Sequence, residues 1–310
     1  MCIRDRFYLN RYTRLWPCYA VSLLLVIAGW YVQGSFNGLA QMFWRLETFQ
    51  RLIVGFTNVT LVGTDLLYSL GFQNGEVVWA AAGRNQLHNA SGYLMNPPSW
   101  SLSVELLFYV VAPFVVISLW RSLALVLFGI VATASVRTVM PELAMSFSWE
   151  FSFPYATAFF GIGACSYWIM MRKTLDTTGE VALAAAVVAL VLHADLYVHG
   201  SIYLALALLL PTLFQLTKNS WLDARIGDLS YPIYVLHVPI RELTKNLDLL
   251  PSKPMQGAIM TIAASLLLVL LVERPADMLR ERWTRSRLRG ASAPAPMALQ
   301  RPGLGRSADP

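Results

Sequence analysis

The stretch WPCYAVSLLLVIAGWYV, residues 16–32, contains no charged side chain, and Arg11 and Arg14 lie just before it. A helix that crosses a bilayer needs about 20 mostly apolar residues. In lipid, only helices and closed barrels satisfy all of their backbone polar groups. Tryptophan and tyrosine rings also favour the water interface, and they occur at both ends of this stretch. The stretch therefore predicts a membrane-spanning helix.

The rest of the chain has the same character. Of the 310 residues, 56% are hydrophobic and 14% are charged, whereas soluble domains carry about 25% charged residues. This composition favours an all-α fold, a polytopic transmembrane bundle of about eight spanning helices. The further expected spans are Leu102–Leu119, Leu123–Met140, Pro154–Met171, Val181–Val198, Ile202–Leu216, Ala258–Val272 and a shorter, more polar one, Leu229–Ile240.

The basic residues between these runs predict the orientation of the helices. They cluster before the first run and after the second, fourth, sixth and last, which places the clusters on one side of the membrane. By the positive-inside rule that side is the cytoplasm, with both chain ends there. Orientation also accounts for the net charge of +6, so no nucleic-acid partner is expected. The pattern is broken by Arg137 and by the connection that carries Arg241, Lys245 and Lys253.

Three other segments do not fit the pattern of spans. The connection Gln33–Ser99 is long and contains a moderately apolar stretch, Leu52–Phe72, which polar residues interrupt. We expect that stretch to be interfacial or re-entrant. Residues 278–310 are basic and rich in alanine and proline, a composition that predicts a flexible cytoplasmic tail. We expect residues 1–6 to be a disordered or non-native start.

The first polar cluster is Arg11 with Arg14. Residues three apart share a helix face, so the two side chains can converge on one anionic group. Guanidinium groups suit phosphates. The alternative is a positive-inside anchor with no ligand, and spacing alone favours that alternative.

The second cluster is Trp100, Ser101, Ser103, Glu105 and Tyr109. Ser101, Glu105 and Tyr109 follow one another at intervals of four, so they line one stripe of a helix. A carboxylate inside a membrane helix is costly and usually faces a cavity or a partner. Glu105 could take the proton of an acceptor hydroxyl, orient that hydroxyl or hold a basic side chain. A structural hydrogen bond between helices is the other interpretation.

The third cluster is Ser230, Tyr234, His237 and Arg241, which run down one helix face at steps of four, three and four. A polar stripe on a short membrane helix indicates a pocket, a pore or a helix–helix contact. His237 can exchange a proton near neutral pH, or it can serve as a hydrogen-bonded packing residue. The sequence has no nucleotide-binding loop and no Cys/His metal signature, so we expect no metal and no cofactor.

Four motifs, in order, resemble the acyltransferase 3 family of bacterial membrane O-acyltransferases. They are Phe7–Pro17 with its Arg-x-x-Arg pattern, Trp100–Tyr109, Leu229–Pro239 and Val272–Pro275, and the resemblance covers residues 7–277. It implies a bundle of about ten helices in the bacterial inner membrane. It also implies transfer of an acyl group, often acetyl, from the co-substrate acyl-CoA to a hydroxyl of a cell-surface or exported glycan. The acceptor would be a carbohydrate or a glycolipid.

With this resemblance, we expect Arg11 and Arg14 to bind acyl-CoA phosphates and Glu105 and His237 to be catalytic. We expect the acceptor pocket to contain Trp100, Ser101, Ser103, Tyr109, Ser230 and Tyr234. The family begins with two further helices, the first bearing a histidine that acts as general base. That histidine has no counterpart before Phe7, so we expect an N-terminally truncated chain that is inactive as written.

Two other functions fit the polar stripes. A transporter or flippase for glycans or lipids would move its substrate without consuming acyl-CoA, and a membrane scaffold would not bind CoA.

Overall fold

A computed structural model describes residues 3–33, 43–79, 88–141, 149–172, 217, 219–247 and 249–279. The expected spans Val181–Val198 and Ile202–Leu216 lie outside the described residues, as does all but the beginning of the expected tail 278–310. Of the other expected spans, Trp16–Val32, Pro154–Met171 and Leu229–Ile240 each lie within one helix, and Ala258–Val272 lies within a helix that ends in a π-helical turn. The span Leu123–Met140 ends one residue beyond its helix, and Leu102–Leu119 is too long, because its helix ends at Val115 and the next begins at Leu119. By length and composition, the described part of the chain holds three helices that could cross a membrane, Phe7–Tyr31, Leu119–Val139 and Lys253–Leu279, and a shorter apolar helix, Ser99–Val115.

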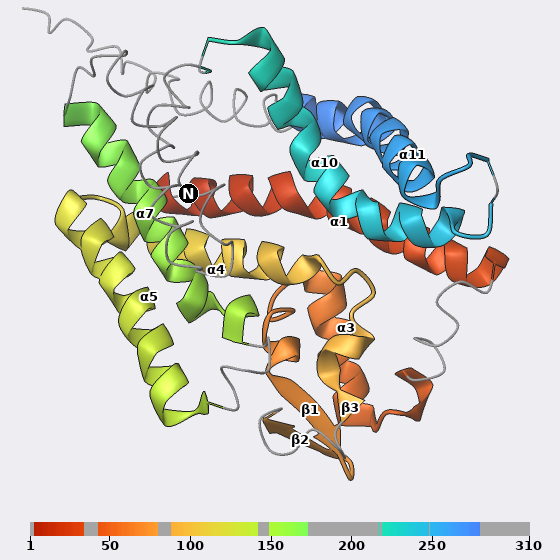
Figure 1. Cartoon of the computed structure of the whole chain (residues 1–310), viewed down its shortest axis with the longest axis horizontal. Helices are drawn as coiled ribbons and strands as arrows, with labels where there is room; N and C mark the ends of the chain where they lie inside the picture. The colour runs from red at the N-terminus through yellow and green to blue at the C-terminus, as the bar shows by residue number, and fades with distance from the viewer. Residues whose placement is uncertain are drawn as a thin grey trace, which may run out of the picture.

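Helix α1 (Ile3–Gln33) is the long central element in Figure 1. Helices α4 (Ser99–Val115) and α10 (Trp221–Thr244) both contact it. Helix α10 also packs against α11 (Lys253–Leu268), which continues into the π-helical turn Val269–Glu273. Because α1 contacts both α4 and α10, the three polar clusters of the sequence come from helices that pack together.

Helices α5 (Leu119–Val139) and α7 (Phe153–Arg172) form a second closely packed pair. Glycines allow this approach. A Cβ atom on Gly129 would lie 2.6 Å from the backbone nitrogen of Ala158, and one on Gly161 would lie 2.8 Å from that of Val126. Small residues at a membrane helix interface let the two backbones come together, which increases their van der Waals contact.

The fold is not all-α as expected, because the connection between α1 and α4 contains a small β-sheet. This connection contains helix α3 (Thr48–Thr60) and a three-stranded antiparallel sheet of β1 (Leu70–Gln73), β2 (Glu76–Trp79) and β3 (His88–Asn89), in the order β2-β1-β3. The β1–β2 turn is Asn74–Gly75, with φ of 50° and 84°. This dipeptide favours the tight turns of β-hairpins, which is the physical reason for a sheet here. The stretch Leu52–Phe72 is therefore not one spanning helix.

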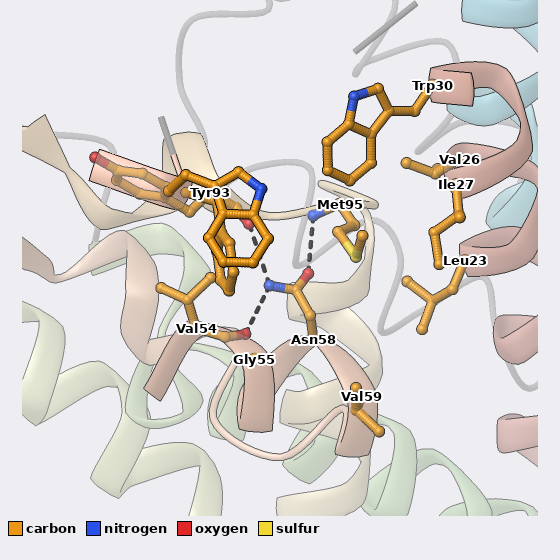
Figure 2. Close-up of a pocket in the computed structure, with 12 residues that line it drawn as sticks. Leu23, Val26, Ile27, Trp30, Val54, Gly55, Asn58, Val59, Tyr93 and Met95 are labelled. Atoms are coloured by element: carbon orange, nitrogen blue, oxygen red, sulfur yellow. Dashed lines mark hydrogen bonds between the residues drawn. The ribbon is translucent and has the colours of Figure 1, made fainter. Parts of the chain in front are cut away.

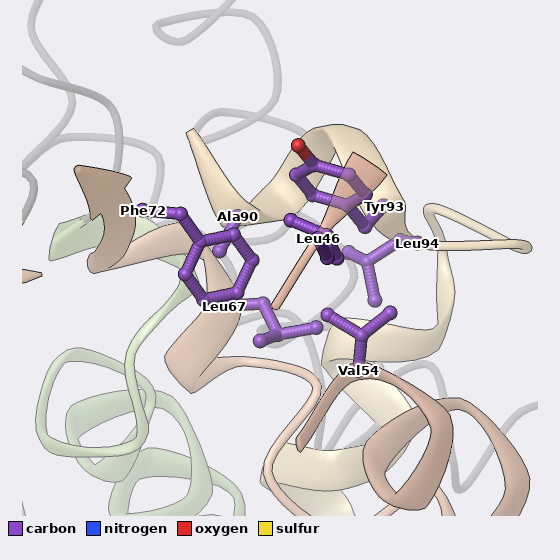
Figure 3. Close-up of a cluster of buried hydrophobic side chains, with 7 residues drawn as sticks. All are labelled: Leu46, Val54, Leu67, Phe72, Ala90, Tyr93 and Leu94. Carbon is purple, nitrogen blue, oxygen red and sulfur yellow. The ribbon is translucent and has the colours of Figure 1, made fainter. Parts of the chain in front are cut away.

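A small hydrophobic core stabilises this connection. Figure 3 shows its buried side chains gathered between α3 and the sheet. They are Leu46, Val54, Leu67, Phe72, Ala90, Tyr93 and Leu94. The unit thus has its own core beside α1 and α4.

Two polar side chains tie α1, α4 and α10 together around a second cluster of buried residues. The Tyr231 hydroxyl donates a hydrogen bond to the backbone carbonyl of Leu15. The fully buried Asn96 amide donates to the Ser22 hydroxyl and to the backbone carbonyl of Val235, at 3.0 Å each. The first bond joins α10 to α1, and the bonds of Asn96 hold the segment just before α4 against the middle of both helices. The apolar residues around them are Leu15, Tyr19, Leu61, Leu102 and Val235.

Candidate functional site

The two arginines of α1 line one cavity. Phe7, Asn10, Arg11 and Arg14 surround a space of about 280 Å³ near the start of the helix. Their spacing of three, one and three residues places them on a single face. Arg11 is half-buried and Arg14 is exposed. The cavity therefore has two guanidinium groups available to an anionic ligand, the arrangement that suits a phosphate.

Contacts with helix α4 lead from Arg11 to a carboxylate. The Arg11 guanidinium lies 5.1 Å from the centre of the Tyr109 ring and 5.4 Å from that of Phe7. The Tyr109 hydroxyl donates a hydrogen bond to Glu105, one turn earlier in α4. The Tyr8 hydroxyl donates to the Val110 carbonyl at 3.1 Å, which fixes α1 against α4 at this level. Arg11, Tyr109 and Glu105 are thus consecutive contacts leading away from the cationic cavity.

The other expected residues of α4 have different partners. The Ser101 hydroxyl lies 2.7 Å from that of Tyr234 in α10, and the Tyr234 hydroxyl also donates to the Pro98 carbonyl at 3.1 Å. The Trp100 ring packs edge-on against Phe151, with 4.7 Å between the ring centres. Ser101 and Tyr234, predicted from separate motifs, are therefore brought together by the fold.

Ser103 faces a residue that the sequence analysis did not assign to the site. Its hydroxyl donates to the Asp65 carboxylate at 2.6 Å and accepts from the Gly63 amide at 2.9 Å. Asp65 is 2% exposed, and this burial raises the pKa of its carboxyl group, while the hydrogen bond from Ser103 opposes the rise. The available signal was a carboxylate inside the apolar stretch Leu52–Phe72, because such a group needs a partner.

The residues of the third cluster do not all lie in one part of the structure. His237 is exposed, and its Nδ1 atom lies 2.6 Å from the Tyr234 carbonyl oxygen. His237 lines a groove between α10 and α11, whereas Arg11 and Arg14 line the cavity on α1. Ser230 is also exposed and donates to the Gly227 carbonyl of its own helix at 2.8 Å. The structure therefore does not bring His237 or Ser230 to the Arg11–Tyr109–Glu105 contacts.

A third cavity, of about 300 Å³, is almost entirely apolar and lies between α1 and α3. Figure 2 shows Leu23, Val26, Ile27 and Trp30 on one side and α3 on the other. Its main polar group is Asn58, whose amide donates to the carbonyls of Val54 and Tyr93 and accepts from the Met95 amide. Because these bonds use the Asn58 amide internally, the cavity offers an apolar surface.

No cluster of three or more metal-ligating side chains occurs among the described residues. Comparison of the sequence with known protein families gives one match. A protein-family model described as an acyltransferase domain matches residues 4–274. Comparison with curated proteins and with solved structures gives no match.

Proposed function

The chain belongs to the acyltransferase 3 family, and from this premise we propose that it moves an acyl group from acyl-CoA to a hydroxyl of a cell-surface or exported glycan. Membership makes the protein a membrane enzyme that transfers acyl groups. We further propose that the acyl group is acetyl, that the membrane is the bacterial inner membrane, and that both ends of this chain lie in the cytoplasm.

The donor half of the proposal is supported by the cavity at Arg11 and Arg14. Acyl-CoA carries several phosphates, and hydrogen bonds from guanidinium to phosphate are among the strong ones. In the proposed orientation the start of α1 faces the cytoplasm, where acyl-CoA is made. The cavity is therefore at the correct end of the helix to receive the donor.

The reaction half is supported by the contact between Tyr109 and Glu105. In the proposed step, Glu105 accepts the proton of the acceptor hydroxyl as its oxygen attacks the thioester carbonyl. The new C–O ester bond forms, the C–S bond breaks, and the proton passes to the departing CoA thiolate. Tyr109 would orient the carboxylate, and Ser101 with Tyr234 would contact the acceptor. The proposed step does not use His237, which lines the groove between α10 and α11.

One observation carries the proposal. Arg11 lines the cationic cavity and contacts the Tyr109 ring, and the Tyr109 hydroxyl donates a hydrogen bond to the Glu105 carboxylate. A phosphate-binding group and a proton acceptor are the two components that acyl transfer from CoA to a hydroxyl needs.

Release of free CoA thiol tests the proposal. The protein expressed from its complete gene and purified in lipid nanodiscs would receive acetyl-CoA and a glycolipid extract, and thiol would be followed with a colorimetric reagent. Loss of a general base typically costs 10²–10⁴-fold in rate, so we expect Glu105→Gln to lower kcat by at least about 100-fold. Glu150→Gln, the same change in the short helix Trp149–Phe151, should retain activity. Undiminished turnover in Glu105→Gln would remove Glu105 from the reaction. Absence of thiol release by the unmodified protein would favour a transporter.

A further inference from the structure

A groove of about 660 Å³ lies between α10 and α11, where the two antiparallel helices approach their connection. The side chains that line it change from apolar to basic along the helices. Ile233, Ala258 and Ile262 line the part toward the helix middles, and Arg241, Lys245 and Lys253 line the part toward the connection. The groove is thus apolar at one end and cationic at the other.

The cationic end has a net positive charge among the described residues. Glu242 pairs with Lys245 at 2.7 Å and approaches Arg241 at 4.0 Å, so this carboxylate faces two of the three basic groups. The Arg241 side chain is 67% exposed, and the Lys253 ammonium donates to the Leu247 carbonyl at 2.7 Å. These basic residues also lie in the connection that breaks the positive-inside pattern, so orientation of the chain does not account for them.

The groove is held in shape by a buried glutamine. The Gln256 amide donates to the carbonyls of Thr244 and Leu247, at 2.8 Å each, and its oxygen accepts from the amide of Leu249 at 3.0 Å. These bonds join the end of α10 to the start of α11. A site that is already formed loses less conformational entropy when a ligand binds.

We propose that this groove binds an anionic phospholipid, with the headgroup phosphate at Arg241 and Lys253 and a hydrocarbon chain along Ile233 and Ile262. Basic pockets between membrane helices attract anionic headgroups, and an apolar wall beside the cations suits a chain that is covalently attached to the phosphate. The inference does not depend on the catalytic role of Glu105, because the groove is separate from the cavity at Arg11 and Arg14.

Lipid binding tests the inference directly. The full chain, in mild detergent, would be titrated with phosphatidylglycerol or phosphatidylcholine, and bound lipid would be counted by native mass spectrometry. We expect tighter binding of phosphatidylglycerol. The double variant Arg241→Gln/Lys253→Gln should weaken it by at least about tenfold, since a charge-assisted hydrogen bond is worth roughly 1.5–3 kcal/mol. Arg225→Gln is the matched control, because Arg225 lies near the other end of α10, where it stacks on Trp221.

Three results would overturn the inference. One is equal affinity for the two lipids, and another is full phosphatidylglycerol binding by the double variant. The third is competition by inorganic phosphate at the same concentration as the lipid, which would show that the hydrocarbon chain contributes nothing. Thermal unfolding of each variant in phosphatidylcholine shows that lost binding does not reflect lost folding. If the double variant fails to fold, Arg241→Gln alone should still weaken phosphatidylglycerol binding more than Arg225→Gln does.

Discussion

The Arg11 guanidinium lies over the Tyr109 ring, 5.1 Å from its centre, while the hydroxyl of the same tyrosine donates to Glu105. The ring and the hydroxyl can therefore be tested separately. Tyr109→Phe keeps the ring but removes the donor, so we expect kcat to fall about tenfold with little change in KM for acetyl-CoA. Tyr109→Leu also removes the ring, and loss of a cation–π contact should raise KM roughly two- to fivefold. Identical KM values for these two variants would contradict the proposed role of the ring.

The two arginines of the cavity should govern donor binding. Arg11→Gln and Arg14→Gln each remove a positive charge beside the cavity. A charge-assisted hydrogen bond to phosphate contributes about 1.5–3 kcal/mol, so we expect KM for acetyl-CoA to rise by about 10- to 100-fold. Arg121→Gln serves as control, because Arg121 is exposed and donates to the Phe114 carbonyl at 3.0 Å. An equal rise in KM for the control would show a general charge effect instead of a site.

Asn96 should contribute to the stability of the bundle. Asn96→Ala leaves the Ser22 hydroxyl and the Val235 carbonyl without the amide that now contacts both. Loss of one partner of a buried hydrogen bond costs about 1–3 kcal/mol, so the thermal midpoint in detergent should fall. Asn89→Ala should cost less, because the Asn89 side chain is exposed and bonds only two residues away, to Ser91. Equal midpoints for the two variants would contradict this role.

The sequence predicted helices where long apolar runs occur, since a run of that length in lipid has few other structures to adopt. It did not predict the sheet between α1 and α4. The Asn74–Gly75 turn was visible in the sequence, but the apolar stretch Leu52–Phe72 was interpreted as one segment. In the structure that stretch holds most of α3, the short helix Leu66–Tyr68 and most of β1, because turn residues and short β-prone runs divide it.

For the candidate site, too, the sequence predicted some contacts and missed others. Intervals of four predicted that Glu105 and Tyr109 share a face of α4, and their hydrogen bond agrees with that spacing. Contacts between distant residues were not predictable, such as Ser101 with Tyr234, 133 residues apart, or Ser103 with Asp65, 38 residues apart. Helical spacing fixes which residues share a face, but the neighbour that this face meets depends on how the helices pack.

Asp65 should make stability depend on pH. Burial raises the pKa of its carboxyl group above the ordinary value, so the unfolded chain loses this proton at a lower pH than the folded chain. As pH rises through that interval the unfolded state holds fewer protons, and the free energy of unfolding falls. Asp65→Asn removes the ionisation but keeps an oxygen that accepts from Ser103. We therefore expect a flatter plot of thermal midpoint against pH, from about pH 3 upward. Glu76→Gln, on an exposed strand residue, should not flatten it. An unchanged slope in Asp65→Asn would contradict the assignment.

Substitution of two glycines of α7 should change stability to different extents, because Gly161 lies against α5 and Gly163 does not. A Cβ atom on Gly161 would lie 2.7 Å from Val126 Cγ2 and 2.8 Å from its backbone nitrogen, whereas one on Gly163 would have no heavy atom within 4 Å. Because the backbone of α5 cannot yield without moving the helix, we expect Gly161→Ala to cost about 1–3 kcal/mol through overpacking. Gly163→Ala should be neutral or slightly stabilising, since alanine favours the helix over glycine by about 1 kcal/mol. Thermal unfolding in one detergent would compare them. A Gly161→Ala variant as stable as Gly163→Ala would show that the two helices are not packed as closely as the structure has them.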